Sequence, residues 1–261
     1  MKEFLLFRLV SNQNVLEAKQ EIVYGRQPVL ELFSSGKQID KIWIDRKMSG
    51  EYEIEIRKIA RDKLIPIVRV PVFKLSKVIN NDKHQGIVAF TTPVSYLEID
   101  TLIKKALESS DNPTILLLDR VTDVRNLGAI SRSALWFGAF GLVIPMKNAA
   151  PINAEAIKSS AGALVHMPVS RVSSIMHVVD QFQKAGFKVY SSSLKAEKLC
   201  AELNFRVPTA IVLGSEEHGV SREIIAKSDD HFLIPGSNQI DSLNVAVSAG
   251  IIMYEVYNQK K

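Results

Sequence analysis

The chain has 261 residues, enough for one large domain or for two domains of unequal size. Hydrophobic residues make up 46% and charged residues 23%, which is typical of a folded globular protein and excludes a disordered, collagen-like or coiled-coil chain. The 33 Lys and Arg residues exceed the 28 Asp and Glu residues by five, and residues 57–83 hold eight basic side chains against two acidic ones.

Segments of helical and strand periodicity alternate in the first third of the chain. We expect helices at 26–35, 51–63 and 72–79, and strands at 40–45, 65–70 and 86–91. Together they predict a small α/β domain over residues 22–92. Pro93 and a polar run at 109–113 flank an amphipathic segment, so residues 93–112 are interpreted as an interdomain linker.

Short apolar segments predict the strands of a second domain over residues 113–261. They lie at 115–119, 140–145, 187–191, 209–214 and 231–235, and a helical stretch follows each of them. This alternation predicts a parallel sheet that is covered on both faces. Ligands of such sheets bind at the carboxyl ends of the strands, so the segments 119–132, 214–221 and 234–244 are the candidate functional loops.

In the first of these loops, Asn126 has the side chain of a helix N-cap, and Gly128 permits close approach of another backbone. Arg132 then projects from the second turn of the helix, away from its apolar stripe. A guanidinium at that place is able to bind a phosphate in a bidentate fork, or it is simply a solvated charge on the helix surface.

The second loop leaves its strand through Gly214 into the adjacent carboxylates Glu216 and Glu217, and Ser221 is placed to cap the next helix. Adjacent acids at a strand end suggest a metal site or general acid–base chemistry. No second group of metal-ligand residues accompanies them, so we prefer the interpretation that one glutamate orients a neighbouring arginine or amide. We therefore expect no metal.

The third loop follows a strand that ends at Ile234 and leads into a helix that begins near Ser242. This helix is almost wholly small or apolar through Ile252, and we expect it to be buried nearly all round. A core helix with a serine cap explains the apolar residues but does not explain the polar Asn244 at its start.

Other sequence features remove several function classes. Neither G-x-G-x-x-G nor G-x-x-x-x-G-K-[ST] occurs, so a classical dehydrogenase or a P-loop NTPase is not supported. G-x-S-x-G and H-E-x-x-H are also absent, so a triad hydrolase or a zinc protease is not supported either. With the single cysteine Cys200 the chain forms no intramolecular disulfide, and we expect a cytoplasmic protein. No apolar run is long enough for a membrane span, no signal peptide is expected, and residues 1–20 carry no motif.

Three motifs taken in order resemble those of the SpoU (TrmH) family of RNA ribose 2′-O-methyltransferases. They are N-x-G-A-x-x-R-S-A at 126–134, L-G-S-E at 213–216, and I-P followed by S-L-N-V-A-V-S-A-G-I within 234–251. The segments YGRQPVLEL at 24–32 and HQGIVA at 84–89 resemble the small domain, similar to ribosomal protein L30e, of RlmB-type 23S rRNA enzymes.

The resemblance implies a fold whose carboxyl-terminal segment forms a deep trefoil knot, a homodimer, and S-adenosylmethionine as the methyl donor. It implies that Gly214, Ile234 and Leu243 contact this cofactor. It also maps the catalytic arginine onto Arg132, as an unusual base or, as we prefer, a phosphate anchor. The groups that orient Arg132 and the ribose would be Asn126, Glu216, Ser242 and Asn244.

The expected activity is methylation of a ribose, on a guanosine in 23S rRNA, with residues 57–83 as a contact for the RNA backbone. Gly236 and Glu217 depart from the family pattern, which often has methionine and glycine there. Two alternatives remain open: the same chemistry on tRNA or on an antibiotic-resistance rRNA site, and a non-catalytic RNA-binding assembly factor.

Overall fold

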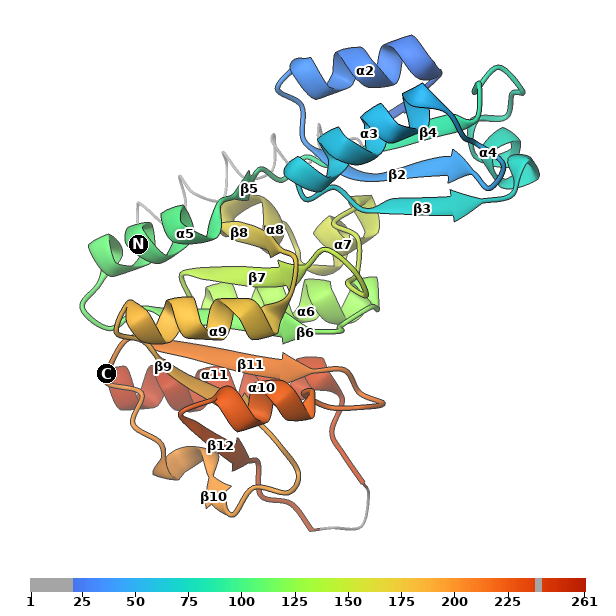
Figure 1. Ribbon diagram of the computed structural model, residues 1–261. Helices are drawn as coiled ribbons and strands as arrows, with labels where there is room; N and C mark the ends of the chain where they lie inside the picture. Colours follow the sequence, from blue (N-terminus) through green and yellow to red (C-terminus); the bar gives the residue numbers. More distant parts are fainter. Residues whose placement is uncertain (1–20, 238–240) are drawn as a thin grey trace. The chain divides into compact units, whose positions relative to one another are not determined.

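The computed structural model describes residues 21–237 and 241–261, which form two compact units (Figure 1). One unit comprises the described residues up to Ser95 together with Ile152–Ala154. The other comprises Tyr96–Pro151 and Glu155–Lys261. No helix among the described residues is long and apolar enough to cross a membrane.

The smaller unit is a four-stranded sheet with helices on both faces. Its strand order is β1-β4-β2-β3, with β2 and β3 parallel and the other neighbours antiparallel. The expected helices and strands are confirmed, with one further strand at the start; the elements are β1 (Ile22–Tyr24), α2 (Arg26–Ser34), β2 (Ile39–Asp45), α3 (Glu51–Asp62), β3 (Ile67–Val70), α4 (Val72–Ile79) and β4 (Ile87–Thr91).

Alternating side chains of β2 and β4 make two cores in this unit, because successive residues of a strand point to opposite faces. Ile42, Ile44 and Ile87 pack in the core that includes residues of α2 and α3. Val88 packs in the second core, with Leu75 of α4. Each helix of the unit is therefore fixed to one face of the sheet.

The larger unit is an eight-stranded sheet in which all neighbouring strands are parallel. This confirms the parallel α/β fold expected from the alternating segments. In the order β10-β12-β9-β11-β6-β7-β8-β5, the strands are β10 (Lys198–Leu199), β12 (Asp230–Leu233), β9 (Lys188–Ser192), β11 (Thr209–Gly214), β6 (Thr114–Asp119), β7 (Gly141–Pro145), β8 (Val169–Val172) and β5 (Tyr96–Leu97).

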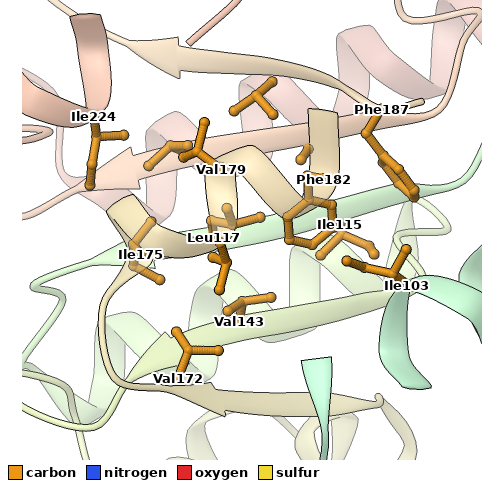
Figure 2. Close-up of a cluster of buried hydrophobic side chains, with 14 of the residues drawn as sticks. Ile103, Ile115, Leu117, Val143, Val172, Ile175, Val179, Phe182, Phe187 and Ile224 are labelled. Atoms are coloured by element: carbon orange, nitrogen blue, oxygen red, sulfur yellow. The ribbon is translucent and has the colours of Figure 1, made fainter. Parts of the chain in front are cut away.

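Helices cover both faces of this sheet, as Figure 1 shows. The first face carries α5 (Ile99–Ser109), α9 (Ile175–Lys184) and α10 (Arg222–Lys227), whose apolar side chains share one buried cluster with the strands (Figure 2). Within it, Ile115 and Leu117 of β6 lie close to Phe182 of α9 (Figure 2). The other elements are α6 (Val124–Trp136), α7 (Ala154–Ser159), α8 (Ala163–His166), the short η1 (Cys200–Glu202) and α11 (Val245–Lys260).

One segment of this unit was interpreted as a linker, and one strand was not predicted. Residues 96–109, expected as part of a linker, form β5 and α5, and Leu102, Ile103 and Ala106 are buried in the core. Strand β8 was not expected because its sequence contains a serine and Arg171, yet Arg171 is only 7% exposed. Its guanidinium lies 3.8 Å from the ring centroid of Tyr96, which covers the charge with an aromatic face.

The final helix also differs from expectation, because it is buried on one side only. Ala249, Ile252 and Met253 are fully buried and α11 packs against α6. On its other side Val247 is 51% and Tyr254 54% exposed. The helix therefore exposes apolar side chains at the surface of this unit.

Candidate active site

The carboxyl ends of β6 and β11 lie side by side and bring two of the candidate loops together. These strands are hydrogen-bonded neighbours, and their registers end with Asp119 opposite Gly214. Strand β9 lies between β11 and β12, so the segment after Ser192 leaves the sheet between the segments that follow Gly214 and Leu233. Segment 192–194 is thus a candidate loop that the sequence analysis missed, because it carries no distinctive motif.

Helix α6 begins earlier than the sequence suggested. Its N-cap is Asp123, whose side chain accepts hydrogen bonds from the backbone N–H groups of Arg125 (2.8 Å) and Asn126 (2.9 Å). Asn126 is therefore not the cap but a residue of the first turn, and its side chain is free to face the neighbouring loop. Arg132 consequently lies in the third turn rather than the second.

Three of the predicted site residues form one hydrogen-bonded group. The side-chain amide of Asn126 donates to Oε1 of Glu216 at 3.1 Å. The amide of Asn244 donates to Oδ1 of Asn126 at 3.0 Å and also to the same Oε1 of Glu216. The group joins the first turn of α6, the loop after β11 and the start of α11, which are far apart in the sequence.

Asn244 has a second task, because it is the N-cap of α11. Its Oδ1 accepts from the backbone N–H groups of Ala246 (2.9 Å) and Val247 (3.3 Å). The helix therefore begins at Val245 and not near Ser242, and Asn244 rather than a serine caps it. Ser242 is exposed, and it makes no hydrogen bond with another described residue.

Arg132 is exposed, and within residues 21–237 and 241–261 its guanidinium has neither a hydrogen bond nor an ion pair. An arginine that is bound to no carboxylate keeps all of its donors for an anionic ligand. It lies six residues, or about 9 Å of helix rise, beyond Asn126. The structure therefore does not join Arg132 to the group formed by Asn126, Glu216 and Asn244.

Gly214 is required by the chain itself. A Cβ atom at this position would lie 1.9 Å from the carbonyl carbon of Gly219 and 2.1 Å from the backbone nitrogen of Val220. The loop folds back so far because Gly219 donates its N–H to the carbonyl oxygen of Ser215 at 2.8 Å. Glu216 lies in the turn that this contact closes.

The other two candidate cofactor residues, Ile234 and Leu243, have main-chain groups that pair with no other described residue. Ile234 is partly buried, and Leu243 is 39% exposed. No hydrogen bond joins the backbone of either residue to another described residue. Since unpaired main-chain groups need a polar partner, these residues fit the recognition of a polar ligand through the backbone. In the described part of the chain, no three His, Cys, Asp or Glu side chains come together as metal ligands would.

Comparisons with known proteins agree over both units. The model of the SpoU rRNA methylase family matches residues 113–254, and that of the RNA 2′-O ribose methyltransferase substrate-binding domain matches residues 22–97. YacO of Bacillus subtilis, named as a TrmH family tRNA/rRNA methyltransferase, is 32% identical over 94% of this chain and 98% of its own length. A TrmH family relative from Staphylococcus aureus is 34% identical over 92% of this chain and 96% of its own.

Solved structures show the same fold. The SpoU methyltransferase AviRb from Streptomyces viridochromogenes, crystallised with AdoMet, superposes with a TM-score of 0.59. It is 23% identical to this chain, and the match covers 97% of this chain and 98% of AviRb.

Proposed function

Because the chain belongs to the SpoU family and is an S-adenosylmethionine-dependent RNA ribose 2′-O-methyltransferase, we propose that it methylates a guanosine ribose in 23S rRNA. The observation that carries the site assignment is the contact among Asn126, Glu216 and Asn244, which come from three separate segments. The separate RNA substrate-binding domain at 22–97 favours a large ribosomal RNA as the substrate.

S-adenosylmethionine supplies an electrophilic methyl group, and the protein has to make the ribose hydroxyl reactive. We assign the orientation of this hydroxyl to Glu216, whose Oε1 accepts from two amides. Its Oε2 bonds to no other described residue and is able to accept from the hydroxyl. Arg132 keeps its proton and anchors a phosphate beside the ribose, and Ser242 contacts the ribose. The hydroxyl proton leaves to phosphate or water.

For the cofactor we assign the main-chain groups around Gly214, Ile234 and Leu243, together with segment 192–194 between them. Gly214 is the last residue of β11 and Ile234 follows β12. Because β9 lies between these two strands, the two residues stand roughly 10 Å apart, two strand spacings. That span suits a ligand with an adenosine at one end and an amino-acid group at the other.

We propose that the smaller unit, residues 22–92, has an L30e-like fold and holds the RNA. Of the eight basic residues at 57–83, Arg57 and Arg69 bind Glu53 of the same unit, the latter at 2.6 Å. The hydrogen bond from Arg57 lowers the pKa of Glu53, which keeps this carboxylate charged. The remaining six are exposed and suit phosphate contacts; they are Lys58, Arg61, Lys63, Lys74, Lys77 and Lys83.

The proposed chain path is a deep trefoil knot. The strand order supports it: the chain leaves β11, skips past β9 to form β12, and then returns through α11, which packs on β11 and α6. The hydrogen-bonded group of the site adds a link between these segments, because Asn244 at the start of α11 donates to Glu216 and Asn126.

A homodimer through α11 and α6 is proposed from their exposed apolar side chains. Val247, Ile251 and Tyr254 follow one another at helical spacing and are 41–54% exposed, and Trp136 of α6 is 75% exposed. We expect the variant Ile251→Arg to sediment as a monomer at concentrations where the unaltered protein sediments as a dimer. An unaltered protein that is monomeric at these concentrations would contradict the assignment.

The test of the proposed function is transfer of labelled methyl groups from S-adenosylmethionine to RNA of cells that lack this protein. Labelled 23S rRNA, mapped by its alkali-resistant 2′-O-methyl linkage, is the expected result, and the enzyme would act in the cytoplasm, where this RNA is made. Label in tRNA only would refute the 23S assignment but keep the reaction. Failure to bind S-adenosylmethionine would contradict the reaction itself.

A further inference from the structure

Arg120, the first residue after β6, has a backbone conformation that is unusual for its type. Its φ angle is +60°, in the left-handed region that glycine occupies without steric cost. Such an arrangement persists only where the surrounding structure holds it, and it often occurs where a site needs a fixed geometry. The contacts of its side chain show what holds it.

The guanidinium of Arg120 joins the end of β6 to the loop that follows β11. Its Nη2 donates to the carbonyl oxygen of Gly219 at 3.2 Å and lies 3.3 Å from Oδ2 of Asp119. The same Oδ2 accepts the backbone N–H of Ser221 at 2.8 Å. Asp119, the last residue of β6, therefore holds the loop 214–221 at Ser221, and the next residue, Arg120, holds it at Gly219.

This loop is also the one that carries Glu216. It is closed at its base by the contact between Gly219 and Ser215, and a further bond runs from the N–H of His218 to Oγ of Ser215 at 3.2 Å. The end of the turn is thus fixed at Gly219, where Arg120 binds. A shift of Gly219 would carry Glu216 away from Asn126 and Asn244.

Arg120 holds this contact although part of its side chain is desolvated. The side chain is 33% exposed, and its Nε is buried without a hydrogen-bond partner among the described residues. A buried polar group without a partner destabilises the folded chain. A left-handed backbone and an unpaired Nε are both unfavourable, which indicates that the position of this guanidinium serves the loop rather than the stability of the fold.

We propose that Arg120 is a positioning residue that holds the loop 214–221 through Gly219 and thereby places Glu216 for the ribose hydroxyl. The inference rests on the role proposed above for Glu216. It assigns to Arg120 no contact with the RNA and no contact with S-adenosylmethionine.

The test compares Arg120→Gly, which tolerates the left-handed backbone but lacks the guanidinium, with Arg120→Lys and with the control Lys227→Ala. Lys227 is ion-paired with Asp180 on the surface of the same unit. Hydrogen exchange of the amides at 219–221 reports on the loop without any need for substrate. We expect the fastest exchange in Arg120→Gly, an intermediate rate in Arg120→Lys and an unchanged rate in Lys227→Ala. The melting temperature of Arg120→Gly should change by less than about 3 °C.

Methyl transfer to rRNA from cells that lack the protein then separates positioning from RNA binding. We expect kcat of Arg120→Gly to fall at least about tenfold while KM for RNA stays within about threefold. Because Arg120 acts through Glu216, the double variant Arg120→Gly, Glu216→Gln should be no slower than Glu216→Gln alone.

Three results would overturn the proposal: unchanged amide exchange, unchanged kcat, or effects of the two substitutions that multiply. A raised KM with unchanged kcat would instead identify Arg120 as a phosphate contact. Unimpaired transfer by Glu216→Gln alone would refute the proposed role of Glu216, which is a separate result from the failure of Arg120→Gly to change the loop.

Discussion

Replacing Gly214 by alanine tests whether this glycine serves the chain or the cofactor. The new Cβ atom would overlap the backbone of Gly219 and Val220 at about 2 Å, and backbone cannot rotate away as a flexible side chain can. The loop 214–221 must therefore move. It then loses the bond from Ser221 to Asp119 and the bond from Arg120 to Gly219.

The expected cost follows from these contacts. Overpacking costs about 1–3 kcal/mol and each of the two lost hydrogen bonds about 1 kcal/mol, so the free energy of unfolding should fall by about 3–5 kcal/mol. For a unit of this size, that loss corresponds to a melting temperature lower by roughly 6–20 °C. The measurement is thermal unfolding by circular dichroism without S-adenosylmethionine, so that contacts to the cofactor contribute nothing.

Gly250→Ala is the matched control. Gly250 lies within helix α11, and a Cβ atom there would contact only Oγ of Ser133 in α6, at an ordinary distance of 3.7 Å. Alanine is preferred to glycine in a helix by about 1 kcal/mol, so this variant should be as stable as the unaltered protein or slightly more stable. A Gly214→Ala variant that melts within about 2 °C of the unaltered protein would refute the steric argument. If it also failed to bind S-adenosylmethionine, the glycine would be needed for the cofactor alone.

Three further predictions concern single side chains. Arg132→Ala should abolish methyl transfer. The free energy of unfolding should change by less than about 0.5 kcal/mol, because the side chain is exposed and unpaired among the described residues. Methyl transfer at the unaltered rate would exclude an essential role of Arg132. Burial raises the pKa of Cys200 to about 12, so iodoacetamide at pH 8 should alkylate it about 10³-fold more slowly in the folded protein than in urea; equal rates would contradict its burial. Burial lowers the pKa of Lys260 from 10.5 to about 8, so between these pH values the unfolded chain holds a proton that the folded chain has released. The stability of the unaltered protein relative to Lys260→Met should therefore rise from pH 8 to pH 10 by about 1–2 kcal/mol, and a constant difference in denaturant titrations would contradict this sign.

Periodicity alone predicted most of the fold, because strands with uniformly apolar residues and helices with an apolar stripe are local patterns. Strand β6 is an example, since all of its residues are buried. Strand β8 was missed because the burial of Arg171 depends on Tyr96, a residue 75 positions away. The linker was misassigned for a similar reason: the amphipathic pattern of α5 does not say which core its apolar side packs against.

The site was predicted in part. The sequence by itself determined the residue types, namely two asparagines, a glutamate and an arginine in motifs near strand exits, and it determined the family resemblance. It misplaced the caps, since Asp123 and Asn126, or Ser242 and Asn244, are chemically equivalent as N-caps, and only the observed helix starts distinguish them.

Only the tertiary structure decided which of these residues meet. Asn126, Glu216 and Asn244 share one group because β6 and β11 are neighbours in the sheet and α11 begins beside them. The same strand adjacency joins Arg120 to Gly219, a contact for which the sequence holds no signal. The pattern of apolar residues in a segment predicts which of its sides is buried. Contacts between segments depend instead on the order of the strands in the sheet, and the packing of the whole chain determines that order.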